Sequence, residues 1–125
     1  MSRVGVTGFC WGGRITWLYA AHNPKLKAGV AWYGRLVGEA TELQPKYPID
    51  VASSLHAPVL GLYGGQDQGI PLADVEKVRR AFPAGTYHLY PAGHGFNCTD
   101  RSDFDAASAR LAFERSIEFF RQHVG

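Results

Sequence analysis

The amino-acid sequence predicts an α/β fold in which a parallel sheet carries helices on both faces. Four short apolar runs have the character of strands, and segments with a helical period lie between them. The runs are nearly continuously apolar rather than alternating, which is typical of strands covered on both faces. Their order, β-α-β-β-α-β-α, favours a parallel sheet of about four strands with three main helices.

The strands are expected at residues 3–9, 28–33, 58–63 and 86–90. The first helix, residues 13–22, is apolar on most sides and stops at Asn23-Pro24, as a buried helix would. A second helix over residues 72–82 has a proline at each end. Residues 35–57 show no sustained period, and a connection of this length is usually functional or mobile.

The last helix has the clearest start signal. Ser102 and Asp105, three residues apart, resemble a capping box at its N-terminus. The apolar residues that follow recur at helical spacing and form one stripe, which consists of Ala106, Ala109, Phe113, Ile117, Phe120 and Val124.

Length and composition limit the classes of protein to consider. The 125 residues suffice for one domain, and the 13 Lys and Arg are scattered among 11 Asp and Glu. We therefore expect neither a nucleic-acid partner nor a membrane partner. No apolar stretch reaches the roughly 18 residues of a membrane span. Met1-Ser2-Arg3 leads directly into a strand, so no signal peptide is expected, and the two unlike cysteines suit a reducing cytoplasm.

The segment Gly8-Phe9-Cys10-Trp11-Gly12 has a G-x-nucleophile-x-G pattern between a predicted strand and a predicted helix. Such a turn is strained, so the residues two before and two after the nucleophile are expected to be small. The helix N-terminus would favour the reactive thiolate, and the Trp11 N–H would face a developing oxyanion. The alternative is a structural cysteine in a glycine-rich turn.

A base and an orienting acid follow in the order typical of α/β hydrolases. Asp67 lies in the loop after the third strand, and His94 lies in the loop after the fourth. Sites of parallel sheets form at this carboxyl edge. Taken singly, Asp67 is equally a turn residue and His94 a solvated loop histidine. Together with Cys10 they predict a nucleophile, an acid and a base in one site.

The other titratable residues are weaker candidates. The remaining histidines fall at a helix end, before a strand, within a strand and in the final turn; they are His22, His56, His88 and His123. Neither Asp50 nor Asp74 displaces Asp67. Cys98 is expected to be an unreactive loop thiol, although it could pair with Cys10 if the two lie close. No metal-ligand spacing occurs, and no cofactor is expected.

At this point the chain resembles a known family. Gly8-Phe9-Cys10-Trp11-Gly12-Gly13, then Gly64-Gly65-Gln66-Asp67 with Pro71, then His94-Gly95-Phe96 are similar to the dienelactone hydrolase (carboxymethylenebutenolidase-like) family, over almost the whole chain. The resemblance implies an α/β-hydrolase fold with Cys10 as nucleophile, His94 as general base and acid, and Asp67 orienting His94. It also implies an activated ester or lactone substrate, typically one bearing a carboxylate.

Two departures from the family pattern stand out. The dienelactone enzyme is expected to hold the substrate carboxylate with an Arg four residues after the histidine, but Cys98 occupies that position. The nearest basic residue is Arg101, which either binds substrate or pairs structurally with Phe104. The elbow also begins at residue 8, whereas in the family it lies near the middle. Residues 1–125 therefore look like one partial domain, the C-terminal half of an α/β-hydrolase fold.

The partial domain leaves several interpretations open. Its nucleophile strand would be an uncovered sheet edge, which predicts a homo-oligomer or a complementing N-terminal half that covers it. The favoured function is hydrolysis of an ester or lactone, with Tyr33 and Arg35 lining the pocket or serving the structure alone. One alternative is a non-catalytic hydrolase remnant that acts as an assembly subunit. Another is a redox thiol protein that uses Cys10 and Cys98.

Overall fold

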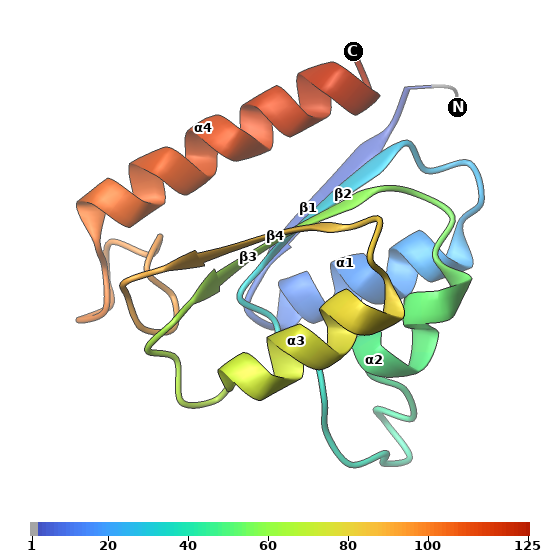
Figure 1. The fold of residues 1–125 in the computed structure, drawn as a ribbon, viewed down its shortest axis with the longest axis horizontal. Helices are drawn as coiled ribbons and strands as arrows, with labels where there is room; N and C mark the ends of the chain where they lie inside the picture. The colour runs from blue at the N-terminus through green and yellow to red at the C-terminus, as the bar shows by residue number, and fades with distance from the viewer. Residues whose placement is uncertain (1–2) are drawn as a thin grey trace.

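Four parallel strands form one sheet between two layers of helix in the computed structural model, which describes residues 3–125 (Figure 1). The first strand was predicted to begin at Arg3 and begins at Gly5 in the structure. Met1 and Ser2 lie outside the described residues. The elements in chain order are β1 (Gly5–Phe9), α1 (Trp11–His22), β2 (Ala28–Trp32), α2 (Pro48–Val51), η1 (Ala52–Ser54), β3 (Val59–Gly64), α3 (Leu72–Ala81), β4 (Thr86–Tyr90) and α4 (Ala106–His123).

The strands run in the order β1-β2-β3-β4, so each crossover places the next strand beside the last. This confirms the predicted parallel α/β architecture. Every residue of β2 and β3 is buried, which explains why those runs are continuously apolar. Helix α4 covers one face of the sheet, and α1, α2 and α3 cover the other (Figure 1).

A short helix, α2, and the turn η1 lie in the connection between β2 and β3, where the sequence predicted no element. At four and three residues they are too short to produce a periodic pattern. Pro48 occupies the first turn of α2, and the Asp50 carboxylate accepts a hydrogen bond from the Tyr47 N–H at 2.9 Å. The connection is therefore ordered by local caps rather than by an amphipathic face.

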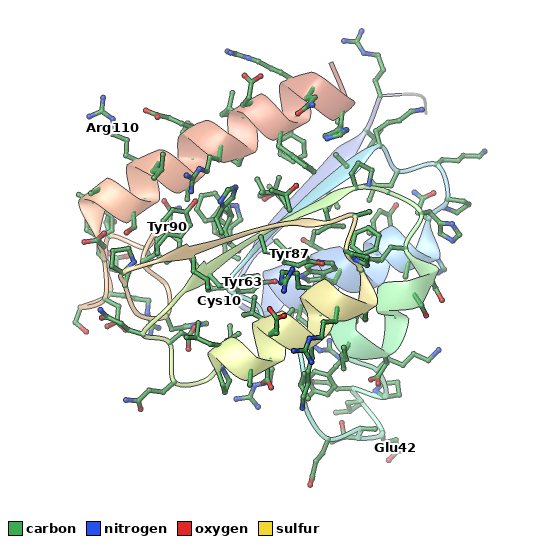
Figure 2. All side chains as sticks on the ribbon, in the orientation of Figure 1. Cys10, Glu42, Tyr63, Tyr87, Tyr90 and Arg110 are labelled. Carbon is green, nitrogen blue, oxygen red and sulfur yellow. The ribbon has the colours of Figure 1, made fainter. Side chains whose placement is uncertain are left out.

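The core between the sheet and α1 is built on large aromatic side chains. Trp17 of α1 is fully buried and donates from Nε1 to the Tyr63 hydroxyl at 2.9 Å. The ring of Tyr87 stacks on Trp17 with centroids 6.0 Å apart. Figure 2 shows Tyr63 and Tyr87 inside the molecule, whereas Arg110 points outward from α4. These contacts join α1, β3 and β4 and hold the sheet against its helical layer.

Helix α4 differs from its prediction at both its start and its buried face. Its N-cap is Asp105, whose carboxylate accepts from the Ser108 N–H at 3.0 Å, so Ser102 is not the cap. The residues buried against the sheet are Ser108, Ala109, Ala112, Ser116 and Phe119. Of the predicted stripe, Ala109 is buried but Phe113 and Ile117 are 56% and 37% exposed. Within residues 3–125 no helix, α4 included, combines the length and hydropathy of a membrane span.

Strand β1 lies at the edge of the sheet, as the early position of the elbow predicted. Within the described chain it pairs only with β2, and exposed and partly buried residues alternate along it. Two large aromatic side chains at its carboxyl end are exposed, Phe9 at 45% and Trp11 at 62%. The edge strand that leads to Cys10 is therefore only partly covered by the described chain.

The cap of α4 provides a first test. Asp105→Ala is expected to lower the unfolding temperature of the full chain because the Ser108 N–H loses its acceptor, whereas Ser102→Ala leaves it unchanged. The hydrogen bonds from Ser108 hold the pKa of Asp105 below its ordinary value of 3.8. The cap therefore stabilises the fold above pH 3.8, and its contribution is lost as the pH falls through the folded-state pKa. Thermal unfolding of both variants at neutral and acid pH checks this; an equal effect of the two substitutions would contradict it.

Candidate active site

Cys10 lies in the tight turn between β1 and α1 with a strained backbone. Its φ is 56° and its ψ is −119°, a conformation that a residue with a side chain rarely adopts. Its N–H donates to the Trp32 carbonyl at 3.0 Å, and its carbonyl accepts from the Gly13 N–H at 2.9 Å. These bonds fix the turn from both sides, so the predicted strained elbow is present.

The positions around Cys10 that require glycine differ from those expected. A Cβ on Gly8 would lie 2.2 Å from the Gly12 carbonyl oxygen, so position 8 requires glycine. A Cβ on Gly12, by contrast, would meet nothing within 4 Å, and the expectation that this residue must be small was wrong. The tight position is the next one, because a Cβ on Gly13 would lie 2.4 Å from the Trp32 carbonyl oxygen.

Asp67 and His94 are hydrogen-bonded to each other. The Asp67 Oδ2 lies 2.6 Å from His94 Nδ1, and its Oδ1 accepts from the Gly69 N–H at 2.8 Å. Asp67 is only 6% exposed, and both of its carboxylate oxygens have hydrogen-bond partners inside the protein. A carboxylate in this position accepts a hydrogen bond from the Nδ1–H group, which leaves Nε2 free as the basic atom.

The loops that carry this pair are packed on each other. The Gln66 N–H donates to the Ala92 carbonyl at 2.9 Å, and a Cβ on Gly64 would lie 2.4 Å from that same carbonyl oxygen. Gly95, directly after His94, has a φ of 71°, which favours glycine and lets the chain turn away behind the imidazole. The carboxyl ends of β3 and β4 thus hold Asp67 and His94 in a fixed relation.

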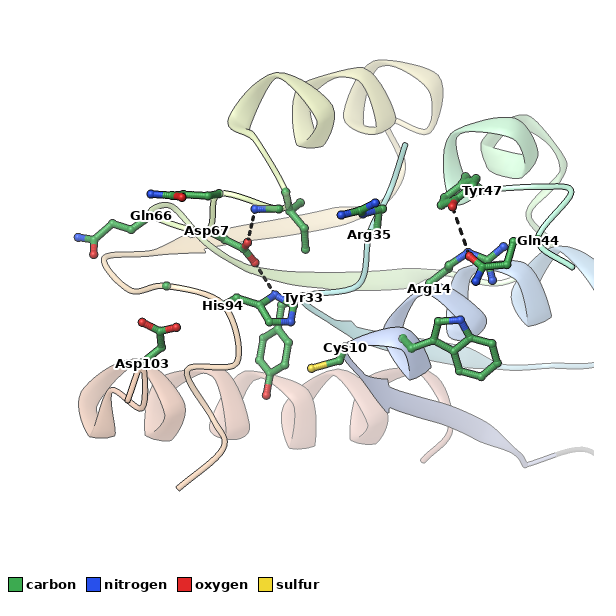
Figure 3. Close-up of a pocket in the computed structure, with 15 residues that line it drawn as sticks. Cys10, Arg14, Tyr33, Arg35, Gln44, Tyr47, Gln66, Asp67, His94 and Asp103 are labelled. Atoms are coloured by element: carbon green, nitrogen blue, oxygen red, sulfur yellow. Dashed lines mark hydrogen bonds and ion pairs between the residues drawn. The ribbon is translucent and has the colours of Figure 1, made fainter. Parts of the chain in front are cut away.

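A cleft of about 650 Å³ brings the three predicted residues together. Its lining consists of Cys10, Trp11, Arg14, Tyr33, Arg35, Gln44, Tyr47, Gln66, Asp67, Gln68, Gly69, Ile70, Gly93, His94 and Asp103. Figure 3 shows the Cys10 sulfur directed toward the space beside His94 and Tyr33. The volume is within the usual range for sites that bind small molecules.

The environment of the Cys10 thiol differs from the thiolate-favouring one that the sequence predicts. Burial raises the pKa of Cys10 above its ordinary value of 9.0, and the positive charge of Arg101 opposes this effect. The negative charge of Asp67 raises the pKa of Cys10 further. At neutral pH the resting group is therefore a neutral thiol, and a base must take its proton for it to react as a nucleophile.

Tyr33 lines the cleft but is almost wholly buried, at 1% exposure. Its ring packs edge-on against the His94 imidazole with centroids 5.3 Å apart, and against Phe96 at 5.1 Å. Burial raises the pKa of Tyr33 to about 12, so the hydroxyl keeps its proton at neutral pH. This placement suits a residue that positions His94.

The backbone N–H of Trp11 is available to a ligand. Trp11 is the first residue of α1, where N–H groups have no acceptor within the helix. It donates to no other backbone group among residues 3–125, and the residue lines the cleft beside Cys10. The predicted oxyanion donor is therefore in a suitable place, next to Cys10.

The arginines near the site have different surroundings. Arg35 lines the cleft, and its guanidinium lies beside Gly69 in the loop that carries Asp67. Arg101 packs over Gly95 and lies 3.7 Å from Asp103, but it does not line the cleft. Arg14 does line it, although no sequence signal marks a residue within this helix pattern as part of a site. Arg14 is buried against Tyr47, which lies 33 positions further along the chain.

The remaining candidates lie apart from the cleft lining. Both cysteines are free thiols, and Cys98 is exposed. The four other histidines occupy the positions predicted for them, and none lines the cleft. Across residues 3–125 no three side chains of His, Cys, Asp or Glu gather as a metal site would require.

Known proteins match the chain along nearly its whole length. The model of the dienelactone hydrolase family matches residues 1–124. A Methylorubrum extorquens protein named "Putative carboxymethylenebutenolidase" is 55% identical over 127 residues, which cover 98% of this chain and 44% of that protein. A protein of the same name from Escherichia coli K12 is 54% identical over 128 residues, covering 98% and 47% respectively.

A solved structure agrees with the fold. The crystal structure of a "Putative Dienelactone Hydrolase" from Klebsiella pneumoniae has a TM-score of 0.94 to this chain at 51% identity, covering 98% of this chain and 53% of that one. Two proteins this similar in sequence and backbone share one α/β-hydrolase architecture. The chain spans about half the length of the curated relatives it matches.

The two elbow glycines give a matched pair of variants. Gly8→Ala is expected to destabilise the full chain by about 1–3 kcal/mol because its methyl group would overlap the Gly12 carbonyl. Gly12→Ala has open space and a helical backbone, so it is expected to be neutral or to stabilise by up to about 1 kcal/mol. Urea unfolding measures both, and a destabilisation by Gly12→Ala as large as that by Gly8→Ala would refute this account of the turn.

The state of the thiol can be measured directly in a Cys98→Ser background, where Cys10 is the sole cysteine. Because burial raises the pKa of Cys10, the rate of alkylation by iodoacetamide should be low at pH 7 and still rise above pH 9.0. Adding Arg101→Gln removes a charge that lowers this pKa, so the profile should move to higher pH. A rate that reaches its plateau below pH 9.0 would contradict the raised pKa.

Proposed function

The chain belongs to the dienelactone hydrolase family, and we propose that it carries the nucleophile, base and acid of a hydrolase that cleaves an ester or lactone. In this proposal Cys10 is the nucleophile, His94 the general base and acid, and Asp67 the residue that orients His94. The observation that carries it is the 2.6 Å contact between His94 Nδ1 and Asp67 in a cleft that also contains the strained Cys10. The nearest chemical precedent is acyl transfer by such triads.

The first half of the reaction forms a thioester. His94 Nε2 removes the proton from Cys10 Sγ as the sulfur attacks the carbonyl carbon, and the Trp11 N–H donates to the oxyanion. The tetrahedral intermediate collapses, the carbon–oxygen bond of the ester breaks, and His94 returns the proton to the departing alkoxide. The raised pKa of Cys10 fits this sequence, because proton removal is coupled to attack rather than completed at rest.

The second half regenerates the thiol. His94 Nε2 takes a proton from water, the hydroxide attacks the thioester carbonyl, and the carbon–sulfur bond breaks to release the carboxylic acid. The proton on His94 then returns to the Cys10 sulfur. Asp67 holds the same imidazole tautomer throughout, because both of its oxygens are fixed by Gly69 and His94.

Single substitutions test the assignment of the nucleophile. In the full-length protein, Cys10→Ala should lower turnover of 4-nitrophenyl acetate by on the order of 10³-fold or more, because no other group can form the thioester. Cys98→Ala is the matched control and should retain activity, since Cys98 does not line the cleft. Circular dichroism verifies that both variants fold. Unchanged hydrolysis by folded Cys10→Ala protein would end the proposal.

A second substitution separates the acid from the nucleophile. Asp67→Asn keeps the shape of the side chain but favours the wrong imidazole tautomer, so kcat should fall by on the order of 10²- to 10⁴-fold. Gln68, which lines the cleft without a bond to His94, gives the comparison variant Gln68→Asn, for which we expect a much smaller change. Equal losses in the two variants would remove Asp67 from its proposed role.

The competing candidate is a non-catalytic subunit that retains the triad but serves in assembly. In the described chain β1 is a sheet edge, and Trp11 is 62% exposed there. A homo-oligomer or a complementing N-terminal half would then cover this edge. Labelling of Cys10 by a thiol reagent, together with native mass measurement, separates the two functions. Complete labelling and a defined assembly with no esterase turnover would favour the subunit.

A further inference from the structure

His94 lies between two residues that have no side chain. Gly93 precedes it, and Gly95, at a φ of 71°, follows it. Glycine has more backbone freedom than any other residue, so a histidine between two glycines is held only weakly by its own chain. The hydrogen bond from Nδ1 to Asp67 fixes the end of the imidazole but not the backbone that carries it. A fixed imidazole therefore needs contacts from elsewhere that hold this backbone.

Two charged side chains of the loop before α4 lie against these glycines. A Cβ on Gly93 would lie 2.9 Å from the carboxyl carbon of Asp103. A Cβ on Gly95 would lie 2.5 Å from the Cδ and Nε atoms of Arg101. Each glycine is thus covered at the place where its own side chain would otherwise be. The backbone on both sides of the histidine is therefore enclosed by a neighbouring part of the chain.

The loop that carries both side chains is closed on itself. Two successive turns lead into it: the Cys98 N–H donates to the Gly95 carbonyl at 2.9 Å, and the Arg101 N–H donates to the Cys98 carbonyl at 3.1 Å. The loop then returns to its origin, where the Asp105 N–H donates to the carbonyl of the fully buried Phe96 at 3.0 Å. Because Asp105 is also the N-cap of α4, the far end of the loop is fixed to a long helix.

The two covering side chains also approach each other. Nη2 of Arg101 lies 3.7 Å from Oδ2 of Asp103, and the side chains are 46% and 45% exposed. An ion pair as exposed as this one is screened by salt and contributes little to the stability of the fold. Its effect is local, because each charge keeps the other over its glycine. In the view of Figure 3, Asp103 and Cys10 lie on opposite sides of His94.

We propose that Arg101 and Asp103 form a latch, closed over the glycines on both sides of His94, that holds the imidazole in its hydrogen bond with Asp67. Both are positioning residues, since they contact the backbone beside His94. The effect of the latch on turnover rests on the proposed function, whereas its effect on the bond between His94 and Asp67 does not. Asp103 gives the simpler test, because Arg101 also lowers the pKa of Cys10.

Three variants of the full-length protein test the latch by turnover of 4-nitrophenyl acetate. Asp103→Ala removes both the contact and the charge, so kcat should fall by about tenfold or more while KM stays unchanged. Asp103→Asn keeps the contact with Gly93 and loses the charge, so a smaller loss is expected. Asp100→Ala is the matched control and should retain activity. Asp100 is exposed in the same loop, and it neither lines the cleft nor forms an ion pair within residues 3–125. A raised KM with unchanged kcat in Asp103→Ala would make Asp103 a substrate contact and overturn the latch.

A measurement without turnover separates the latch from the catalytic proposal. In Cys10→Ala protein, proton NMR observes the Nδ1 proton of His94, which the bond to Asp67 protects from exchange with water. We expect this proton to exchange severalfold faster when Asp103→Ala is added, and at an unchanged rate when Asp100→Ala is added. Faster exchange supports the latch even if the protein hydrolyses no ester. Equal exchange in the two variants would refute the latch whether or not the protein is a hydrolase.

A double-mutant cycle in the same Cys10→Ala protein tests whether the two residues act together. The influence of Arg101 on the Cys10 thiol is absent there, so Arg101→Gln reports on His94 alone. We expect Arg101→Gln and Asp103→Ala to speed the exchange of the His94 proton together hardly more than either does singly, because either one opens the latch. Effects that multiply as those of independent residues do would overturn it.

Discussion

Close contact between backbone segments, with no side chain between them, is the constraint on which the rest of this site depends. Gly8, Gly13 and Gly34 each present bare backbone to a neighbouring segment at the turn between β1 and α1. A residue at φ 56° persists only where the surrounding structure fixes it, and these contacts do so for Cys10. Because Gly34 lies just after β2 and next to Tyr33, the same packing that fixes the turn at Cys10 also positions Tyr33 against His94. The position of Cys10 and one wall of the cleft are therefore set by one group of glycines.

Much of the fold was predictable from the sequence because its central strands are buried on both faces. The runs that became β2 and β3 are apolar throughout, and that pattern survives without any knowledge of tertiary contacts. The buried face of α4 was not predictable in the same way. Ser108 and Ser116 face the sheet because small side chains allow close approach, whereas a search for hydrophobic period selects Phe113 and Ile117 instead.

The candidate site, like the fold, was predictable from the sequence only in part. Cys10, Asp67 and His94 follow strands in an order that sequence alone conveys, and the cleft brings all three together. The place of Arg14 in the cleft could not be predicted from the sequence, because the residues that bury it there, Lys46 and Tyr47, are distant in the chain. The direction in which the pKa of Cys10 is shifted could not be predicted from the sequence either. A helix N-terminus stabilises a thiolate, but burial opposes ionisation, and only the structure reveals how far the thiol is buried.

The backbone groups of the edge strand β1 alternate, residue by residue, between pointing toward β2 and pointing away from it. The Val4 carbonyl and the Cys10 N–H both bond toward β2 and its flanking residues. Since the direction of backbone groups alternates along a strand, those of Gly5, Thr7 and Phe9 point the other way, where no described strand lies. Amide hydrogens at these odd-numbered positions should exchange with deuterium far sooner than those of Val6, Gly8 and Cys10. Any segment that pairs with this edge would slow the odd-numbered amides and leave the others as they were, so isotope exchange along these six residues records whether the edge is occupied.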